Sequence, residues 1–468
     1  MLLYLRAISE ISIRKCIFQK GWEMMKQQTF LQSVIRIAIP VALQSMLQSS
    51  FSMIDQFMVG QLGSTSIAAI GIAGKFSFMY STVIGAVAAI AGIMLSQYIG
   101  QQNKRAADKS LCVNLLVSVA LGVVFTLLCL LFSGQIKGLY SEDAATVWQA
   151  AAYLRILSGT FLPIGVASIL SVMLRCHDRA NAPLIASLLS AVTNTVLNYL
   201  LIFGKLGFPA LGVKGAAIAS VICQYVNVLT VLIFFRSLMK KQSERIYASI
   251  RLSSAEMRQY AVMLLPVVAN ECLWSFGQNV YALIYGHIGT QPLAAVTLIA
   301  PVESLLIGAL SGFAQAAGIL IGKRLGEEEY DKAYDESILL MRYGFIGSLV
   351  LSFLLILLKD SYVSIYQVEP YVRQTAKWLL VAFATLAPFK VQNMILGGGI
   401  IRSGGKTKYI MWIDLMGTWL MGVPLGFLSA YLFRLPVAWV YFLIGLEEVA
   451  RWLVSVWLFR SRKWIVKI

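Results

Sequence analysis

The sequence has few charged residues for its length, and this scarcity argues against a soluble fold. Of the 468 residues, 13% are Asp, Glu, Lys or Arg, whereas 58% are hydrophobic. Soluble domains carry about 25% charged and about 45–50% apolar residues. A soluble surface built from this composition would expose large apolar patches. The composition therefore indicates a protein that lies in a lipid bilayer.

Histidine and cysteine are also scarce, which argues against a metal centre or a disulfide framework. The chain has two His and six Cys, and no C-x-x-C pair occurs. Zinc sites and disulfide scaffolds need such clusters. The phosphate-binding pattern G-x-x-x-x-G-K-[ST] is incomplete, because Ile400 occupies its first glycine position ahead of Gly405. No convergent catalytic set is found, so we expect neither an enzyme nor a cofactor.

What the sequence does contain is a series of long apolar stretches. A membrane-spanning helix needs about 20 such residues. The sequence therefore predicts an all-α polytopic membrane protein with about twelve transmembrane helices. The expected spans are 31–58, 65–95, 110–132, 146–173, 183–203, 213–235, 259–285, 293–321, 338–358, 374–400, 408–431 and 436–459.

The positive charge is distributed unevenly between these spans. The net charge is +17, and if the N-terminus is cytoplasmic, most of the 39 Lys and Arg lie in cytoplasmic segments. The positive-inside rule then places both termini in the cytoplasm, with the protein in the plasma membrane. The basic residues are not interleaved with aromatic residues, so nucleic acid is not expected as a partner.

The two halves of the chain repeat one another. When the chain is shifted so that Pro266 lies on Pro40, Gly286 lies on Gly60 and Gly326 lies on Gly100. Six spans in each half give the repeats the same orientation, which makes them parallel repeats about an axis along the membrane normal. We therefore expect two six-helix lobes that enclose a central cleft. The expected divisions are an N-terminal extension (1–29), an N-lobe (30–236), a cytoplasmic linker (237–258), a C-lobe (259–460) and a basic tail (461–468).

The N-terminal extension is too interrupted by charge for a signal peptide and too short to span the bilayer. Met24 and Met25 stand directly before the polar start of the first span. We therefore expect residues 1–24 to be dispensable.

Three stretches resemble a known family. In the first span, Pro40 is followed by Val-Ala-Leu-Gln-Ser, and Asp55 is followed by Gln-Phe-Met-Val-Gly. The fifth span contains Asn194-x-x-x-Asn198-Tyr-Leu-Leu-Ile-Phe-Gly, and the tenth ends in Gly-Gly-Gly-Ile-Ile-Arg402-Ser-Gly-Gly. Together these stretches resemble the multidrug and toxic compound extrusion (MATE) family, over about residues 30–460.

The resemblance implies a secondary antiporter that exports cationic organic compounds in exchange for Na⁺ or H⁺. It implies Asp55 as the first-lobe acid with Asn194 and Asn198 as its polar neighbours, and Glu271 as the second-lobe acid. In one branch of the family an Asp stands at the position of Asn198, and in another an Asp stands at the position of Val391. The resemblance therefore implies one less charge in the first lobe and no acid at that position on the tenth span.

The residues themselves also single out Asp55. A charge inside the bilayer costs about 3 kcal/mol or more, so such a residue is a functional candidate. Gln44, Gln48 and Ser52 precede Asp55 at helical spacing and form a polar stripe on one face. The carboxylate can hold a proton, since burial disfavours its charged form, or it can bind Na⁺ together with Asn oxygens. We expect no other metal. A purely structural hydrogen bond between helices is the alternative.

Other charges within the spans allow two interpretations each. Glu271 is either the second-lobe acid or the ion-pair partner of Lys390, and protonation of such a pair would provide a switch. Glu303 and Lys75 are secondary candidates for function, with packing and charge neutralisation as alternatives. Asp414, Glu447, Glu448 and Arg451 are interpreted mainly as a structural charge cluster.

The expected partners follow from this interpretation: small cationic organic substrates and the lipid bilayer, with the protein acting as a monomer. The alternative function is a lipid-linked oligosaccharide flippase of related architecture. A flippase should carry more basic residues in its cleft to meet phosphate, whereas here the first lobe offers an acid and amides.

Overall fold

The structure is a computed structural model that describes residues 2–133, 144–241 and 253–468. Every regular element in these ranges is helical, as the apolar runs predict. Three stretches in the second half widen into π-helix: Met394–Ile401, Met416–Gly422 and Leu428–Leu432. The α-helices are α1 (Leu2–Gly60), α2 (Ser64–Gly100), α3 (Lys104–Phe132), α4 (Ala144–Leu157), α5 (Phe161–Cys176), α6 (Asn181–Phe203), α7 (Val213–Lys241), α8 (Ser254–Ile288), α9 (Thr290–Gly326), α10 (Tyr330–Ser364), α11 (Pro370–Asn393), α12 (Thr407–Leu415), α13 (Val423–Phe427) and α14 (Val437–Arg460).

Eleven helical segments of the described ranges are long and apolar enough to cross a membrane. In three of them the chain crosses as a composite helix: α4 with α5 (Thr146–Cys176), α11 with its π-helical end (Pro370–Ile401), and α12 with α13 (Thr407–Leu432). Helix α14 is 24 residues long and differs by carrying Glu447, Glu448 and Arg451 near its middle. With α14 as the twelfth, the number of predicted spans is confirmed, although several helices extend beyond the predicted limits.

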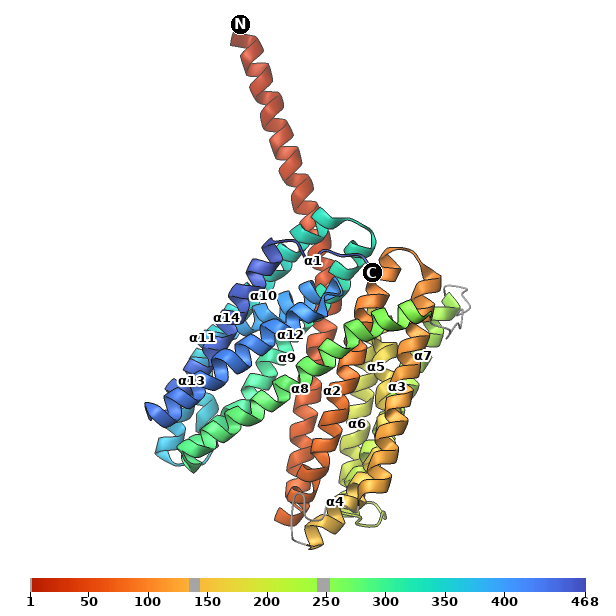
Figure 1. Cartoon of the computed structure of the whole chain (residues 1–468), viewed down its shortest axis with the longest axis vertical. Coiled ribbons are helices and arrows are strands. Elements are labelled where there is room, and N and C mark those ends of the chain that lie inside the picture. The colour runs from red at the N-terminus through yellow and green to blue at the C-terminus, as the bar shows by residue number, and fades with distance from the viewer. Residues whose placement is uncertain (1, 134–143, 242–252) are drawn as a thin grey trace.

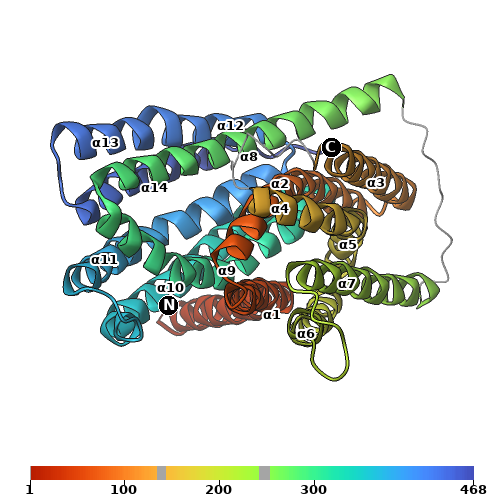
Figure 2. The same cartoon turned by 90° about the horizontal axis from the view of Figure 1, so that it is seen from below.

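The helices form two lobes that diverge toward the end of the molecule opposite the C-terminus. Figure 1 shows α2 to α7 on one side and α8 to α14 on the other, with the first part of α1 projecting beyond the bundle. Both views place α1 beside α9 (Figures 1 and 2), and α8 crosses toward α2 and α3 near the linker. Of the linker predicted at 237–258, residues 242–252 lie outside the described part of the chain.

The lobes meet at the end where the C-terminus lies, and glycines there let the backbones of facing helices come into contact. A Cβ on Gly100 of α2 would overlap the carbonyl group of Lys323 on α9, and a Cβ on Gly326 would overlap that of Gln97. Gly312 lies equally close to the carbonyl oxygen of Ala38 on α1. We call the Gly100 and Gly326 contacts the glycine seam. The absence of side chains lets α2 and α9 approach backbone to backbone.

The glycine seam should tolerate no added methyl group. We expect Gly100→Ala to lower the stability of this conformation by about 1–3 kcal/mol, because the backbone of α9 must shift to make room. The measurement is the thermal unfolding midpoint of the purified protein in detergent. Gly85→Ala on the same helix is the matched control, since a Cβ there would meet nothing within 4 Å. Equal midpoints for the two variants would show that the seam is not tightly packed.

The C-terminal tail lies against the same end of the lobes. Gln97 donates from Nε2 to the carbonyl oxygens of Ser403 (2.8 Å) and Val466 (3.2 Å), and its Oε1 accepts from the backbone N–H of Ile468 (2.8 Å). Trp464 in the tail is fully buried. The segment predicted as a basic tail is therefore folded onto the protein and ties the second lobe to α2.

Candidate functional site

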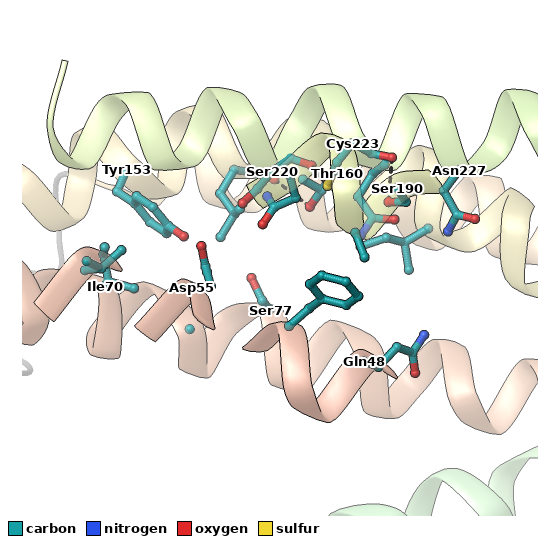
Figure 3. Close-up of a pocket in the computed structure, with 18 of the residues that line it drawn as sticks. Gln48, Asp55, Ile70, Ser77, Tyr153, Thr160, Ser190, Ser220, Cys223 and Asn227 are labelled. Carbon is teal, nitrogen blue, oxygen red and sulfur yellow. Dashed lines mark hydrogen bonds between the residues drawn. The ribbon is translucent and has the colours of Figure 1, made fainter. Parts of the chain in front are cut away.

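A cavity of about 940 Å³ lies inside the first lobe, among α1, α2, α4, α5, α6 and α7. This volume is at the upper end of the range of about 300–1,000 Å³ for small-molecule sites. The wall is apolar on the α2 side and polar on the side of α6 and α7 (Figure 3). The polar lining residues are Gln48, Asp55, Ser77, Tyr153, Thr160, Ser187, Ser190, Asn194, Ser220, Gln224 and Asn227.

Asp55 is the one acidic residue among those that line this cavity in the described part of the chain. Asn198 Nδ2 donates to Asp55 Oδ1 at 2.5 Å and to Asn194 Oδ1 at 3.1 Å. The two asparagines lie one turn apart on α6, so their side chains share a face. The structure thus brings together Asp55, Asn194 and Asn198, which the sequence grouped through the family resemblance.

The environment of Asp55 provides oxygen atoms and, among the described residues, no balancing positive charge. No Lys or Arg among the described residues forms an ion pair with Asp55, and Asn198 Oδ1 is buried without a hydrogen-bond partner among them. Figure 3 shows the Tyr153 side chain directed toward Asp55. A carboxylate beside spare amide oxygens suits a hard cation such as Na⁺, and the same carboxylate can hold a proton. No group of three or more His, Cys, Asp or Glu in the described ranges could hold a metal ion.

The predicted stripe on α1 faces this region. Gln48 lines the cavity. One turn before it on α1, Gln44 Nε2 donates to Ser187 Oγ on α6 at 2.8 Å. The side chain of Ser52 lies outside the described residues. The stripe therefore joins α1 to α6 at two levels, at Gln44 and at Asp55.

Helix α7 contributes polar residues that the sequence reasoning missed. Ser220, Gln224 and Asn227 line the cavity opposite α1. Their spacing of four and three residues within an apolar span is the same signal that identified the stripe on α1. Applied to α7, it would have found them.

In the second lobe, Glu271 is half-buried on α8 and interacts electrostatically with Arg402 and Asp414. Its neighbour Asn270 donates from Nδ2 to Asp414 Oδ2 at 2.7 Å. An ion pair between Glu271 and Lys390 does not occur among the described residues. Lys390 instead interacts with Glu303 and Glu447.

The secondary candidates do not converge on the cavity. Glu303 on α9 accepts a hydrogen bond from the Tyr441 hydroxyl on α14, within the second lobe. Lys75 is exposed on α2. The structure therefore gathers Gln48 with Asp55, whereas Glu303 and Lys390 belong to the other lobe.

The charges on α14 form a buried cluster around Arg451. The guanidinium lies 3.4 Å from Glu447 Oε1, 3.8 Å from Asp414 Oδ1 and 3.9 Å from Glu448 Oε2. It also donates to Thr418 Oγ1 in the second π-helical stretch. Tyr281 donates to Glu447 Oε2 at 2.5 Å. One cation thus joins α14 to α12 at the centre of the second lobe.

The family model MatE matches the chain twice, over residues 40–200 and 266–428. The two matches begin at Pro40 and Pro266, the same positions that begin the internal repeat. Together they cover more than half of the chain.

Curated relatives match over nearly the whole length. A protein named as a probable multidrug resistance protein NorM of Thermotoga maritima is 24% identical over 92% of this chain and 93% of its own. An uncharacterized transporter, YisQ of Bacillus subtilis, is 20% identical over 93% of this chain and 95% of its own.

Solved structures share the fold. A transporter from Pyrococcus furiosus, described as having a binding pocket of reversed polarity, aligns with a TM-score of 0.83 at 19% identity over 92% of this chain and 95% of its own. An outward-facing multidrug resistance MATE transporter aligns with a TM-score of 0.81 at 19% identity over 92% of this chain and 96% of its own. The double match of the family model, supported by this shared architecture, shows that the chain belongs to the MatE family of multidrug and toxic compound extrusion transporters.

Proposed function

We propose that this transporter is a secondary antiporter that exports cationic organic compounds from the cell in exchange for Na⁺ or H⁺. The observation that carries the proposal is the environment of Asp55: a carboxylate facing a cavity of about 940 Å³ with amide partners and no ion-paired Lys or Arg among the described residues. A charged group inside the bilayer needs compensation. A proton, a Na⁺ ion or a cationic substrate can each supply it.

Exchange follows from competition for this one carboxylate. If the entering cation and the leaving substrate both neutralise Asp55, the binding of either weakens the binding of the other. Binding linkage is reciprocal, so each must displace the other across a cycle that opens the cavity to alternate sides. The two lobes (30–236 and 259–460) are proposed as the moving bodies, with both termini in the cytoplasm and the protein acting as a monomer in the plasma membrane.

Glu271 is proposed as an acid of the second lobe that responds to the same cation. It interacts with Asp414 and Arg402, and it forms no ion pair with Lys390 within the described chain. A change in the charge of Glu271 therefore breaks no ion pair with Lys390. Gln48 is proposed to contact substrate, since it lines the same cavity as Asp55, about two turns away on α1.

The flippase alternative is not favoured by the comparisons. Many of the curated relatives are named as multidrug resistance proteins.

The purified protein in vesicles should export a fluorescent organic cation under either a Na⁺ gradient or a pH gradient. It should not export the cation under the other gradient. The measurement is dye movement with a Na⁺ gradient at equal pH, and separately with a pH gradient without Na⁺. The gradient that drives transport names the coupling ion. Protein-free vesicles and vesicles with a dissipating ionophore are the controls. Transport under neither gradient would overturn the antiport proposal.

A further inference from the structure

A second cavity of about 470 Å³ lies deeper in the molecule, where the first lobe meets α9. Its wall comes from α1, α2, α5, α7 and α9. It shares Gln48, Ile164, Gln224 and Asn227 with the cavity around Asp55, so the two cavities adjoin one another. The polar residues of this deeper compartment are Gln44, Ser45, Gln48, Ser81, Ser168, Ser171, Arg175, Gln224, Asn227, Ser311 and Gln315.

The deeper compartment has the opposite polarity to the first. Arg175, near the end of α5, is the one charged side chain among its described lining residues, and no acid is among them. The nearest acid along the chain, Asp178, already pairs with Lys323, its Oδ1 lying 3.1 Å from Lys323 Nζ. One of the two adjoining cavities therefore presents a carboxylate and the other a guanidinium.

The guanidinium of Arg175 is held in place but not neutralised. Its Nη2 donates to Gln44 Oε1 at 3.1 Å, and Gln44 is fixed in turn by its bond to Ser187 Oγ at 2.8 Å. Its Nε is buried and has no hydrogen-bond partner, and no ion pair to Arg175 occurs within the described residues. A buried charge without a counter-charge is costly. A bound anionic group would supply the missing counter-charge.

A purely topological role for Arg175, as one of the positive charges on the cytoplasmic side, accounts for this arrangement less well. Such a role needs only a charge in water or among lipid headgroups. Here the side chain lines a compartment that also receives Ser311 and Gln315 from the other lobe, and its acceptor partner is a neutral amide.

We propose that Arg175 is an anion-recognition residue, and that the transporter accepts elongated amphoteric organic molecules whose cationic group lies toward Asp55 and whose carboxylate binds Arg175. This inference deepens the proposed function and rests on it for the role of Asp55. Gln44, at the level of Arg175, and Asp55 are three turns apart on α1, or about 16 Å along the helix. A guanidinium recognises a carboxylate through two parallel N–H donors, which favours it over a lysine at such a site.

The test is equilibrium binding of ciprofloxacin and of its methyl ester to the purified protein in detergent. The two compounds share the amine-bearing aromatic body, and only the first carries a carboxylate. We expect Arg175→Gln to weaken ciprofloxacin binding about tenfold or more, as for loss of a charged hydrogen bond, and to change ester binding less than about twofold. Arg175→Lys should recover part of the loss.

Arg155→Gln is the matched control. Arg155 is in the same composite span, is exposed, and donates to Ser133 Oγ at 2.7 Å outside the cavity. It should change neither affinity. Thermal unfolding midpoints show whether each variant is folded, and Arg175→Lys carries the test if Arg175→Gln does not fold.

Three results would overturn the anion subsite: no binding of ciprofloxacin to the wild type, equal losses for acid and ester, or unchanged binding of both. Because binding needs no ion gradient, these results are independent of the antiport proposal. Failure of gradient-driven transport with selective loss of acid binding would retain the subsite and overturn the antiporter.

Discussion

Replacing Asp55 by asparagine should reduce gradient-driven export of a fluorescent organic cation by about 100-fold, near the upper end of measured coupling between sites. The substitution removes the charge and the titratable group while keeping nearly the same shape. The new amide still offers an oxygen to Asn198 Nδ2, so the contact between α1 and α6 is conserved. The loss should therefore fall on exchange and not on folding.

The measurement is dye export from proteoliposomes at matched protein content, with unfolding midpoints recorded for both proteins. Asp331→Asn is the matched control, because that carboxylate is 88% exposed and pairs with Arg462 outside the cavity. Normal export by the Asp55 variant would make Asp55 a structural residue. The search for the coupling site would then move to Glu271 in the second lobe.

Replacing Arg451 by methionine should destabilise the protein by about 3–5 kcal/mol, as when one partner of a buried ion pair is removed. Arg451 is 7% exposed and is the cation shared by Asp414, Glu447 and Glu448. Methionine fills a similar volume but leaves these carboxylates without their common partner. Because the cluster joins α14 to α12, its loss should loosen the centre of the second lobe.

The combined variant Arg451→Met, Asp414→Asn, Glu447→Gln, Glu448→Gln should regain much of the lost stability, since removing a buried charge cluster as a whole costs less than breaking it. The readout for both variants is the fraction of monodisperse protein that survives heating in detergent. Arg462→Met is the control, because its pair with Asp331 is largely exposed and worth less than about 1 kcal/mol. A variant of Arg451 as stable as this control would show that the cluster does not hold the lobe together.

The sequence predicts the fold closely, because its main determinant acts along the chain. The length of each apolar run decides whether a helix can cross the bilayer, and no contact between helices is needed to count the spans. The register of Pro40 and Pro266 likewise exposes the repeat without any knowledge of packing. Asp55 stands out for a similar reason, since one carboxylate in an apolar run is visible in the sequence.

The partners of the charged residues could not be predicted in the same way. Two residues at similar depth can face different neighbours, because the rotation of each helix about its axis is set by packing with the others. Glu271 and Lys390 share a depth in the predicted spans, yet Lys390 interacts electrostatically with Glu303 and Glu447. Arg175 does not stand out in the sequence, since nothing in its own helix shows that its side chain lines a cavity with α1 and α9.

The two contacts of the glycine seam are related to one another by the internal repeat. Gly100 contacts the backbone of Lys323, and Gly326 contacts that of Gln97. The shift that carries Gly100 onto Gly326 also carries Gln97 onto Lys323. Such reciprocal contacts define an isologous interface, the kind that two copies of one subunit make across a two-fold axis. The end of the molecule where the C-terminus lies therefore has the interface geometry of a homodimer. A six-helix half on its own would present a surface complementary to itself.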